Sequence, residues 1–245
     1  MSARAIALPS FLRACPCMGN PGRYTHGFAW LLGALVAILL LYPMSEDGFV
    51  GALGYAILMS LTFIGAAIHS AWRTQDIWIA IVLVVIADVS LLGESPDATP
   101  LHHVVTSLAH LLFFVQVTRL ALVRVLAGER ITTDHLYGAA CIYMMIAVTW
   151  TPLYLLILAT DKAAFAGSAL MVPNVTWREI MYFSFSSLTT LGFGDIVPMS
   201  NLARSATSLE AVTGNLFLAI LIGRMAGLHV NTLAAQPRPT DGPDY

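Results

Sequence analysis

The chain has 245 residues, of which 58% are hydrophobic and only 11% are charged, and its mean hydropathy is +0.76. Soluble domains carry about 25% charged residues, so this composition excludes an ordinary soluble protein and indicates an integral membrane protein. The formal net charge of −2 leaves no basic excess for nucleic acid. We therefore expect the lipid bilayer as the surrounding medium and no nucleic-acid partner.

Residues 1–23 hold Arg4, Arg13 and Arg23 and no acidic residue. They lack the short apolar core near the start and the small-residue cleavage site that mark a signal peptide. We interpret this stretch as a cytoplasmic N-terminal tail. Its Cys15 and Cys17 provide half of a zinc site, so metal binding, lipid attachment and free thiols are alternatives, of which we favour free thiols.

Six apolar segments come next, each near the ~20 residues that a helix needs to cross the hydrocarbon core of a bilayer. The insert at 161–202 is too polar and too interrupted to span, but its aromatic, Ser/Thr-rich part at 177–188 fits a half-membrane helix. The predicted fold is an all-α membrane protein, with six transmembrane helices and a re-entrant segment between spans five and six. The predicted spans are 24–43, 49–71, 76–93, 101–126, 136–160 and 203–228.

The first four spans form a predicted membrane domain at 24–127. A voltage-sensing helix needs several arginines, because each charge that crosses the full field contributes about 2.3 kcal/mol per 100 mV. The fourth span has only Arg119 and Arg124, both near its inner end. We interpret them as interfacial anchors that follow the positive-inside rule, and we expect no strong voltage sensing.

Asp88 is an acidic residue within the apolar third span. It can pair with His103 or His110, which lie seven residues apart on one face of the fourth span, and protonation of such a pair would make the protein sensitive to pH. A plain structural hydrogen bond is the alternative that we favour. A metal site of these three residues is a further hypothesis, but their spacing is not specific.

The stretch Thr189–Asp195, with the sequence TTLGFGD, follows the predicted half-membrane helix and precedes the last apolar segment. A cation can leave water only where other groups replace its hydration shell, and rings of backbone carbonyls can do so. These carbonyls must turn toward one axis, which needs backbone conformations that residues with a Cβ resist. Gly192 and Gly194, at alternate positions, relieve that restriction, so the stretch fits an ion-selectivity filter.

The motif resembles the T-x-G-[Y/F]-G-D signature of the potassium-channel family. The resemblance extends back to the YFSF run at 182–185 and forward through Pro198 to Gly214. It implies a pore domain at 136–228, with the pore helix at 177–188 and the selectivity filter at 189–195. Two residues depart from the commonest pattern, Leu191 for valine and Phe193 for tyrosine, and both bear on the rigidity of the filter.

The resemblance also implies roles for single residues and an assembly. Thr189, Asp195, Tyr182 and Phe183 are expected to support the filter, the aromatic residues together with Phe185 as a collar behind it. A filter of this type needs four identical segments around one axis, so a homotetramer is implied. Potassium ions are expected to bind at Thr190, Leu191, Gly192, Phe193 and Gly194.

Glu210 lies within the apolar last span. An ionisable residue such as Asp, Lys or Arg costs about 2.5–3.5 kcal/mol at the centre of an inserted helix, and it usually faces protein and has a partner. We expect Glu210 to lie behind the pore helix as a filter support, protonated or bonded to Ser/Thr hydroxyls, rather than to bind ions.

The rest of the last span supplies candidates for the cavity or gate. Gly214 corresponds to the glycine that many family members use as a gating hinge, and a close-packing site for a neighbouring helix is an equal alternative. Asn215, Leu218 and Ile222 follow helical spacing and are expected to face the cavity. The Asn215 amide would either hydrate a waiting ion or form an interhelical hydrogen bond. Residues 229–245 are expected to be a short tail without a ligand-sensing domain.

The basic residues predict the orientation. With the N-terminus inside, nine of the 12 Lys and Arg residues lie on the inner side, and only Lys162, Arg178 and Arg204 lie outside, which agrees with the positive-inside rule. Both termini are then cytoplasmic and the re-entrant segment opens outward. The resemblance to bacterial family members implies a prokaryotic plasma membrane.

These features together predict a potassium-selective channel that conducts passively. We expect no enzymatic chemistry and no cofactor, with potassium as the permeant ligand. The alternatives are a weakly selective cation channel and a regulatory subunit that assembles with another pore. A membrane enzyme or metal-dependent hydrolase would need convergent ligands such as an H-E-x-x-H helix, which the sequence lacks. Its candidate residues would be His69, His102, His103, His110 and Asp88.

Overall fold

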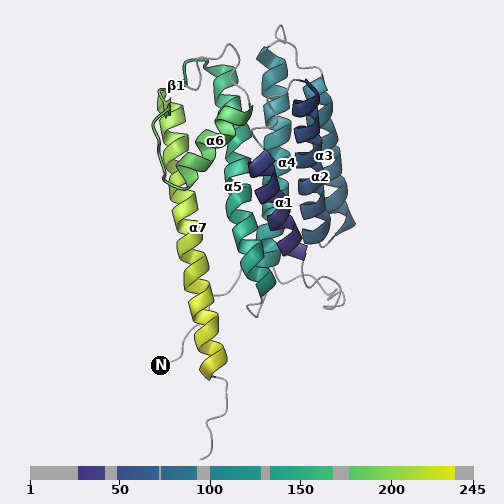
Figure 1. The fold of residues 1–245 in the computed structure, drawn as a ribbon, viewed down its shortest axis with the longest axis vertical. Helices are drawn as coiled ribbons and strands as arrows, with labels where there is room; N and C mark the ends of the chain where they lie inside the picture. Colours follow the sequence, from purple (N-terminus) through teal and green to yellow (C-terminus); the bar gives the residue numbers. More distant parts are fainter. Residues whose placement is uncertain are drawn as a thin grey trace, which may run out of the picture.

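The computed structural model describes residues 27–41, 49–71, 73–92, 100–127, 133–167 and 177–234. The predicted tail at 1–23, with Cys15 and Cys17, lies outside these ranges. The described part is mostly helical (Figure 1). Its elements are α1 (Gly27–Leu41), α2 (Phe49–Ser70), α3 (Thr74–Leu92), α4 (Pro100–Ala127), α5 (Thr133–Thr160), β1 (Phe165–Gly167), α6 (Trp177–Leu188), β2 (Ile196–Pro198) and α7 (Asn201–Ala234).

Helices occupy all six segments that the sequence predicts as spans, and α6 has the bounds predicted for the half-membrane helix. Helix α7 runs on to Ala234, so the first residues of the predicted tail at 229–245 are helical instead. Among the described residues, Leu101–Ala127, Thr133–Thr160 and Asn201–Arg224 are long and apolar enough to cross a membrane. Such segments suit a bilayer because a helix satisfies all its backbone polar groups internally. The composition and these helices indicate a membrane protein.

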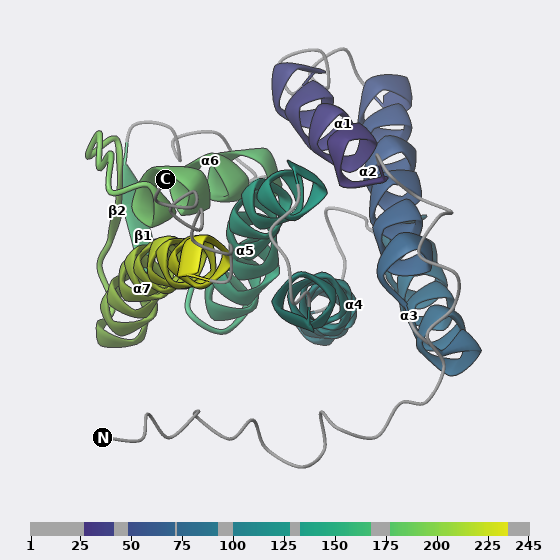
Figure 2. The same ribbon diagram turned by 90° about the horizontal axis from the view of Figure 1, so that it is seen from below.

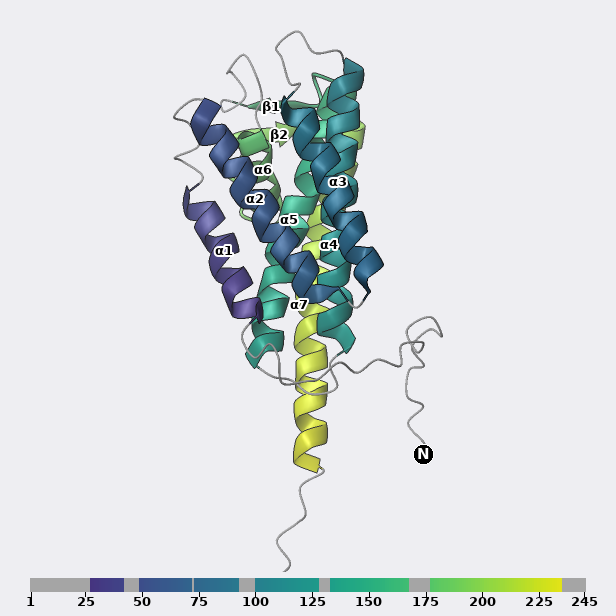
Figure 3. The same cartoon turned by 90° about the vertical axis from the view of Figure 1, so that its right-hand side faces the viewer.

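The helices form two groups joined along α4 and α5. Figure 2 shows α5, α6 and α7 on one side and α2 and α3 on the other, with α4 between them. Helix α1 packs on α2 and α5, and the Asp134 carboxylate at the start of α5 accepts a hydrogen bond from the Phe28 N–H at the start of α1, 3.2 Å away. The C-terminal part of α7 extends beyond the other helices (Figure 3).

Two apolar cores correspond to these two groups. The first core joins α1, α2, α4 and α5 through buried side chains such as Phe28, Phe63 and Phe113. The second core surrounds Tyr154 of α5 and includes Phe183 of α6, together with residues of both strands and of α7. Helix α6 is therefore enclosed by protein on the side of α5 and α7.

A two-stranded antiparallel sheet was not predicted in the insert at 161–202. Strand β1 pairs with β2 so that Gly167 lies opposite Ile196, directly after Asp195. A Cβ at Gly167 would lie 1.9 Å from the backbone oxygen of Asp195, so only glycine permits this approach. The sheet holds the end of the TTLGFGD segment against the chain that precedes α6.

Candidate functional site

Helix α6 ends in a hydrogen-bonded cap that leads directly into the TTLGFGD segment. The Thr190 N–H donates to the Ser187 carbonyl at 3.1 Å, and the Leu191 N–H donates to the Ser186 carbonyl at 2.8 Å. Thr190 itself has φ of 58°. These features form a Schellman motif, in which the left-handed position is usually glycine. A threonine there is strained, as functional positions often are.

The backbone of the segment alternates in the sign of φ. Thr190, Gly192 and Gly194 have φ of 58°, 57° and 79°, whereas the intervening Leu191 and Phe193 do not have positive φ. Alternation in the sign of φ allows successive peptide groups to turn to the same side. A Cβ on Gly192 or Gly194 would meet no atom within 4 Å. Both positions therefore favour glycine because of φ and not because of space.

The same segment is uncovered in the single chain. Leu191 and Phe193 are 60% and 65% exposed, although both side chains are large and apolar. The Phe193 ring stacks on the Tyr182 ring of α6, with centroids 6.2 Å apart. The Tyr182 hydroxyl also hydrogen-bonds to the Asp195 side chain. Tyr182 thus contacts both ends of the Phe193–Asp195 stretch.

The three aromatic residues predicted as a collar face different neighbours. Phe183 lies edge-on to Tyr154 and Phe165, at centroid distances of 5.3 and 5.2 Å. Phe185 packs instead against the first core. Only Tyr182 touches the ring of a TTLGFGD residue among the described aromatic pairs. The structure therefore distributes these side chains around α6 and does not gather them into one ring.

Glu210 lies behind α6, fully buried at 0% exposure. The Tyr154 hydroxyl of α5 donates to Oε2 of Glu210 at 2.5 Å, and Ser184 Oγ of α6 is in short contact with Oε1. Ser184 Oγ also lies 2.7 Å from the Ala147 carbonyl oxygen of α5. Glu210 thus connects α7 to both neighbouring helices.

A second link between α6 and α7 lies one helical turn further along. A Cβ on Gly214 would lie 2.7 Å from Leu188 Cδ1 and 2.9 Å from the Leu188 carbonyl oxygen. That carbonyl accepts a hydrogen bond from the Tyr143 hydroxyl of α5 at 3.2 Å. Gly214 is therefore a close-packing position against the end of α6. Asn215, Leu218 and Ile222, the other predicted cavity residues, are exposed on α7 in the single chain.

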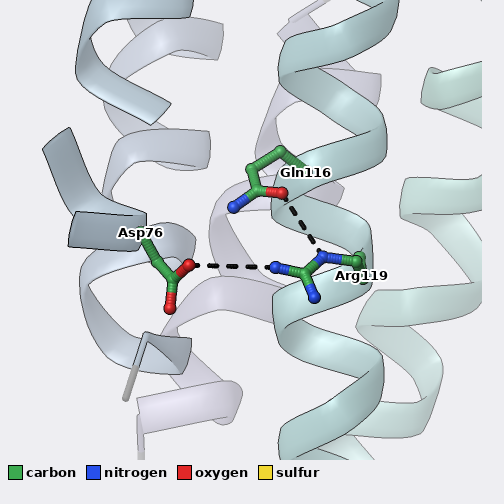
Figure 4. Close-up of polar contacts among 3 residues, drawn as sticks. All are labelled: Asp76, Gln116 and Arg119. Carbon is green, nitrogen blue, oxygen red and sulfur yellow. Dashed lines mark hydrogen bonds and ion pairs between the residues drawn. The ribbon is translucent and has the colours of Figure 1, made fainter. Parts of the chain in front are cut away.

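Asp88 and Arg119 of the first four helices form their contacts with other side chains of the predicted membrane domain at 24–127. Ser60 Oγ donates to Asp88 Oδ1 at 3.0 Å, so Asp88 pairs with a hydroxyl of α2 and not with a histidine of α4. Arg119 of α4 lies 3.8 Å from Asp76 of α3, and its Nε donates to Gln116 at 3.3 Å (Figure 4). No group of three metal-ligating side chains occurs within the described ranges.

Several residues of this site carry no signal of their own in the sequence. Tyr143 and Tyr154 are ordinary aromatic residues of an apolar span, and Gly167 stands in a polar insert. Their partners are 28 to 56 residues away: Tyr143 contacts Leu188, Tyr154 contacts Glu210, and Gly167 lies against Asp195. The TTLGFGD motif, the helix at 177–188, Glu210 and Gly214 were recognisable from local sequence.

The comparison with protein families bears on the second half of the chain. Residues 131–230 match a family model described as an ion channel. The match indicates an ion channel. It covers α5, α6, the TTLGFGD segment and most of α7, which is the part in which the site lies. The matched family is one of channels rather than enzymes. No curated protein and no solved structure matches the chain.

Proposed function

We propose that the protein is a potassium-selective channel that conducts ions passively, with TTLGFGD as its selectivity filter. The alternation of φ along Thr190–Gly194 carries this proposal. It is the backbone arrangement that turns consecutive carbonyl oxygens to one side, where they can replace the hydration shell of a potassium ion. The ion ligands are Thr190, Leu191, Gly192, Phe193 and Gly194, and no cofactor takes part.

The position of α6 supports this role for the segment. The carbonyl end of a helix carries a partial negative charge, and α6 ends at Leu188, directly before the filter. A dehydrated cation is stabilised by that field. Asp195, at the other end of the filter, accepts a hydrogen bond from the Ile196 N–H at 3.1 Å and serves with Thr189, Tyr182 and Phe183 as filter support.

We further propose that four copies form the pore. Each chain supplies one filter segment, whereas a carbonyl ring of this type needs four. The exposed Leu191 and Phe193 side chains support an assembly, because in a tetramer they lie beside neighbouring subunits rather than in an open pathway. Gly214, Asn215, Leu218 and Ile222 then belong to the cavity or gate, and the close approach of Gly214 to Leu188 favours a packing role for this glycine over that of a hinge.

The membrane topology completes the proposal. Helices α1–α5 and α7 are the six spans, α6 is the re-entrant pore helix, and both termini are cytoplasmic in a prokaryotic plasma membrane. The pairing of Arg119 with Asp76, at an Arg119 side-chain exposure of 56%, fits an interfacial anchor. We therefore expect at most weak dependence of gating on voltage.

A weakly selective cation channel is the second candidate. Phe193 contacts Tyr182 by ring stacking alone, because it lacks the hydroxyl that a tyrosine would bring to the same position. A filter whose Phe193 position is held by stacking alone can widen more easily there than one that also has a hydrogen bond at that position. This observation favours relaxed selectivity over a complete loss of conduction.

The deciding experiment uses the purified chain in liposomes. We expect potassium-driven flux, its loss in a Gly192→Asp control, and a reversal potential near the potassium equilibrium value with potassium on one side and sodium on the other. A reversal potential near zero would favour the weakly selective channel. No flux from a folded tetramer at any voltage would favour a regulatory subunit that needs another pore-forming chain.

A further inference from the structure

A fully buried acidic residue stands where α5, α6 and α7 meet, and no cation accompanies it. Glu210 contacts Tyr154 and Ser184, and Ser184 in turn contacts the Ala147 carbonyl. We name these four residues the Glu210 cluster. Among the described residues, no lysine, arginine or histidine forms an ion pair with Glu210. A buried carboxylate without a cationic partner is strongly unfavourable.

The number of hydrogen atoms in the cluster identifies its protonation state. Ser184 has one hydroxyl hydrogen, yet its oxygen lies at hydrogen-bond distance from both the Ala147 carbonyl oxygen and Oε1 of Glu210. The carbonyl oxygen and an ionised carboxylate can only accept. With an ionised Glu210, one of the two contacts therefore has no hydrogen. With a proton on Oε1, Glu210 donates to Ser184, Ser184 donates to Ala147, and Tyr154 donates to Oε2.

We propose that Glu210 is a positioning residue that acts as a neutral carboxylic acid, holding the pore helix α6 between α5 and α7 so that the filter keeps its conducting geometry. This inference rests on the proposed channel function. Removal of the proton introduces a buried charge and deprives one Ser184 contact of its hydrogen. The cluster then loosens, and the pore loses selective conduction as the pH rises.

One helical turn of α6 separates Ser184, in the Glu210 cluster, from Leu188 at the end of α6, where the proposed filter begins. Ser184 and Leu188 are one turn apart on α6, and they face Glu210 and Gly214, which are one turn apart on α7. The turn between Ser184 and Leu188 also carries the Ser186 and Ser187 carbonyls that accept the N–H groups of Thr190 and Leu191. A shift of α6 at Ser184 is therefore transmitted to the residues that set the first φ value of the filter.

The other titratable groups near Glu210 do not account for a loss of selective conduction at alkaline pH. The two that face it are tyrosines of α5, Tyr154 through its hydrogen bond and Tyr143 through its charge interaction. On α6 and α7, the neighbours in contact are hydroxyl groups and apolar side chains. Glu179 and Arg178 of α6 form their own ion pair at 3.0 Å.

The test compares the intact tetramer with Glu210→Gln, whose amide can donate to Ser184 and accept from Tyr154 but cannot ionise. Glu179→Gln is the matched control, because it removes a second buried acid of the same site region. Infrared spectroscopy measures the C=O band of a protonated carboxylic acid. We expect this band in the wild type and in Glu179→Gln, and its loss in Glu210→Gln.

Potassium flux and the potassium–sodium reversal potential are then followed as the pH is raised. We expect selective flux to decline at alkaline pH in the wild type and in Glu179→Gln, whereas Glu210→Gln keeps the value that it shows at neutral pH. Tyr154→Phe should move the decline to higher pH, since the lost hydrogen bond stabilises the carboxylate more than the neutral acid. An acid band unaffected by Glu210→Gln, or the same alkaline decline in that variant, would overturn the proposal.

Failure of the channel function itself is recognised separately. If none of the proteins passes potassium at any pH, thermal unfolding of the tetramers over the same pH range replaces the flux measurement. The inference about Glu210 is supported if the wild-type midpoint falls as the pH rises from about 4.3, the ordinary pKa of a glutamic acid, until Glu210 ionises in the folded protein, and that of Glu210→Gln does not. It is overturned if both midpoints fall alike.

Discussion

At the scale of single residues, the decisive property of the site is backbone conformation. Thr190, Gly192 and Gly194 all have positive φ, a region that costs a residue with a Cβ roughly 1–2 kcal/mol. Thr190 bears this cost inside the Schellman cap of α6, where glycine is usual. The chain therefore retains a threonine hydroxyl at this position of the proposed filter at the expense of local stability.

Replacing Gly192 by alanine tests this requirement without a steric clash. We expect Gly192→Ala to lose potassium-driven flux and selectivity, because alanine resists a φ of 57° while its Cβ would meet no atom within 4 Å. Gly33→Ala in α1 is the matched control, since a Cβ there also meets nothing within 4 Å and the helix has ordinary φ. Equal flux in the two variants would show that left-handed φ at Gly192 is dispensable.

At the scale of elements, three contacts that differ in kind hold the end of α6 and the end of the TTLGFGD segment. Tyr143 of α5 donates to the Leu188 carbonyl, Gly214 of α7 packs against Leu188, and the sheet brings Gly167 against Asp195. These contacts fix both the end of the pore helix and the exit of the filter. Small changes at the two glycines should therefore act on selectivity although neither residue lines the filter.

Gly214→Ala should destabilise the packing of α7 on α6. Its Cβ would lie 2.9 Å from the Leu188 backbone oxygen, which cannot move without shifting the helix end. Overpacking of this kind costs about 1–3 kcal/mol. A lower midpoint of thermal unfolding and reduced selectivity are expected. Gly223→Ala in the same helix, where a Cβ meets no neighbour, serves as the control and should not lower the midpoint.

Gly167→Ala should disturb the filter exit by a different route. A Cβ at this position would lie 1.9 Å from the Asp195 backbone oxygen, so β1 and β2 cannot keep their register. We expect a shift of the reversal potential toward that of sodium, with Ala166→Ser, an exposed neighbour on the same strand, behaving as the wild type. An unchanged reversal potential in Gly167→Ala would exclude the sheet from any role in selectivity.

At the scale of the whole molecule, the single chain leaves its functional surfaces uncovered. Leu209, Val212, Leu216 and Ile220 of α7 are each more than half exposed, and the C-terminal part of α7 extends away from the other helices (Figure 3). Lipid can cover apolar side chains, but it cannot complete a ring of filter carbonyls. The proposed filter would therefore need further copies of the same chain to complete its ring.

The assembly state can be measured directly. Native mass spectrometry of the purified protein should give a mass four times that of the 26.4 kDa chain, because four filter segments complete one ring. Dilution in mild detergent should not yield a conducting monomer. A stable dimer or monomer with full potassium flux would contradict the proposed pore.

Much of the site could be predicted from local sequence because its chemistry is local. Gly192 and Gly194, at alternate positions, permit the backbone conformations that a carbonyl ring needs, and the polar run at 177–188 indicates a short helix. Asp88 shows the limit of this reasoning. Its acidic character predicts a polar partner, but the choice of Ser60 over His103 or His110 depends on how α2, α3 and α4 pack.

The sequence by itself determined where the helices lie and which backbone segment suits an ion ligand, since apolar length and glycine spacing depend on neighbouring residues only. The tertiary structure alone decided what surrounds that segment. Glu210 meets Ser184 and Tyr154 across 26 and 56 residues, and Gly214 meets Leu188, because α5, α6 and α7 converge. Contacts between distant positions follow from helix packing, for which no single stretch of sequence carries a signal.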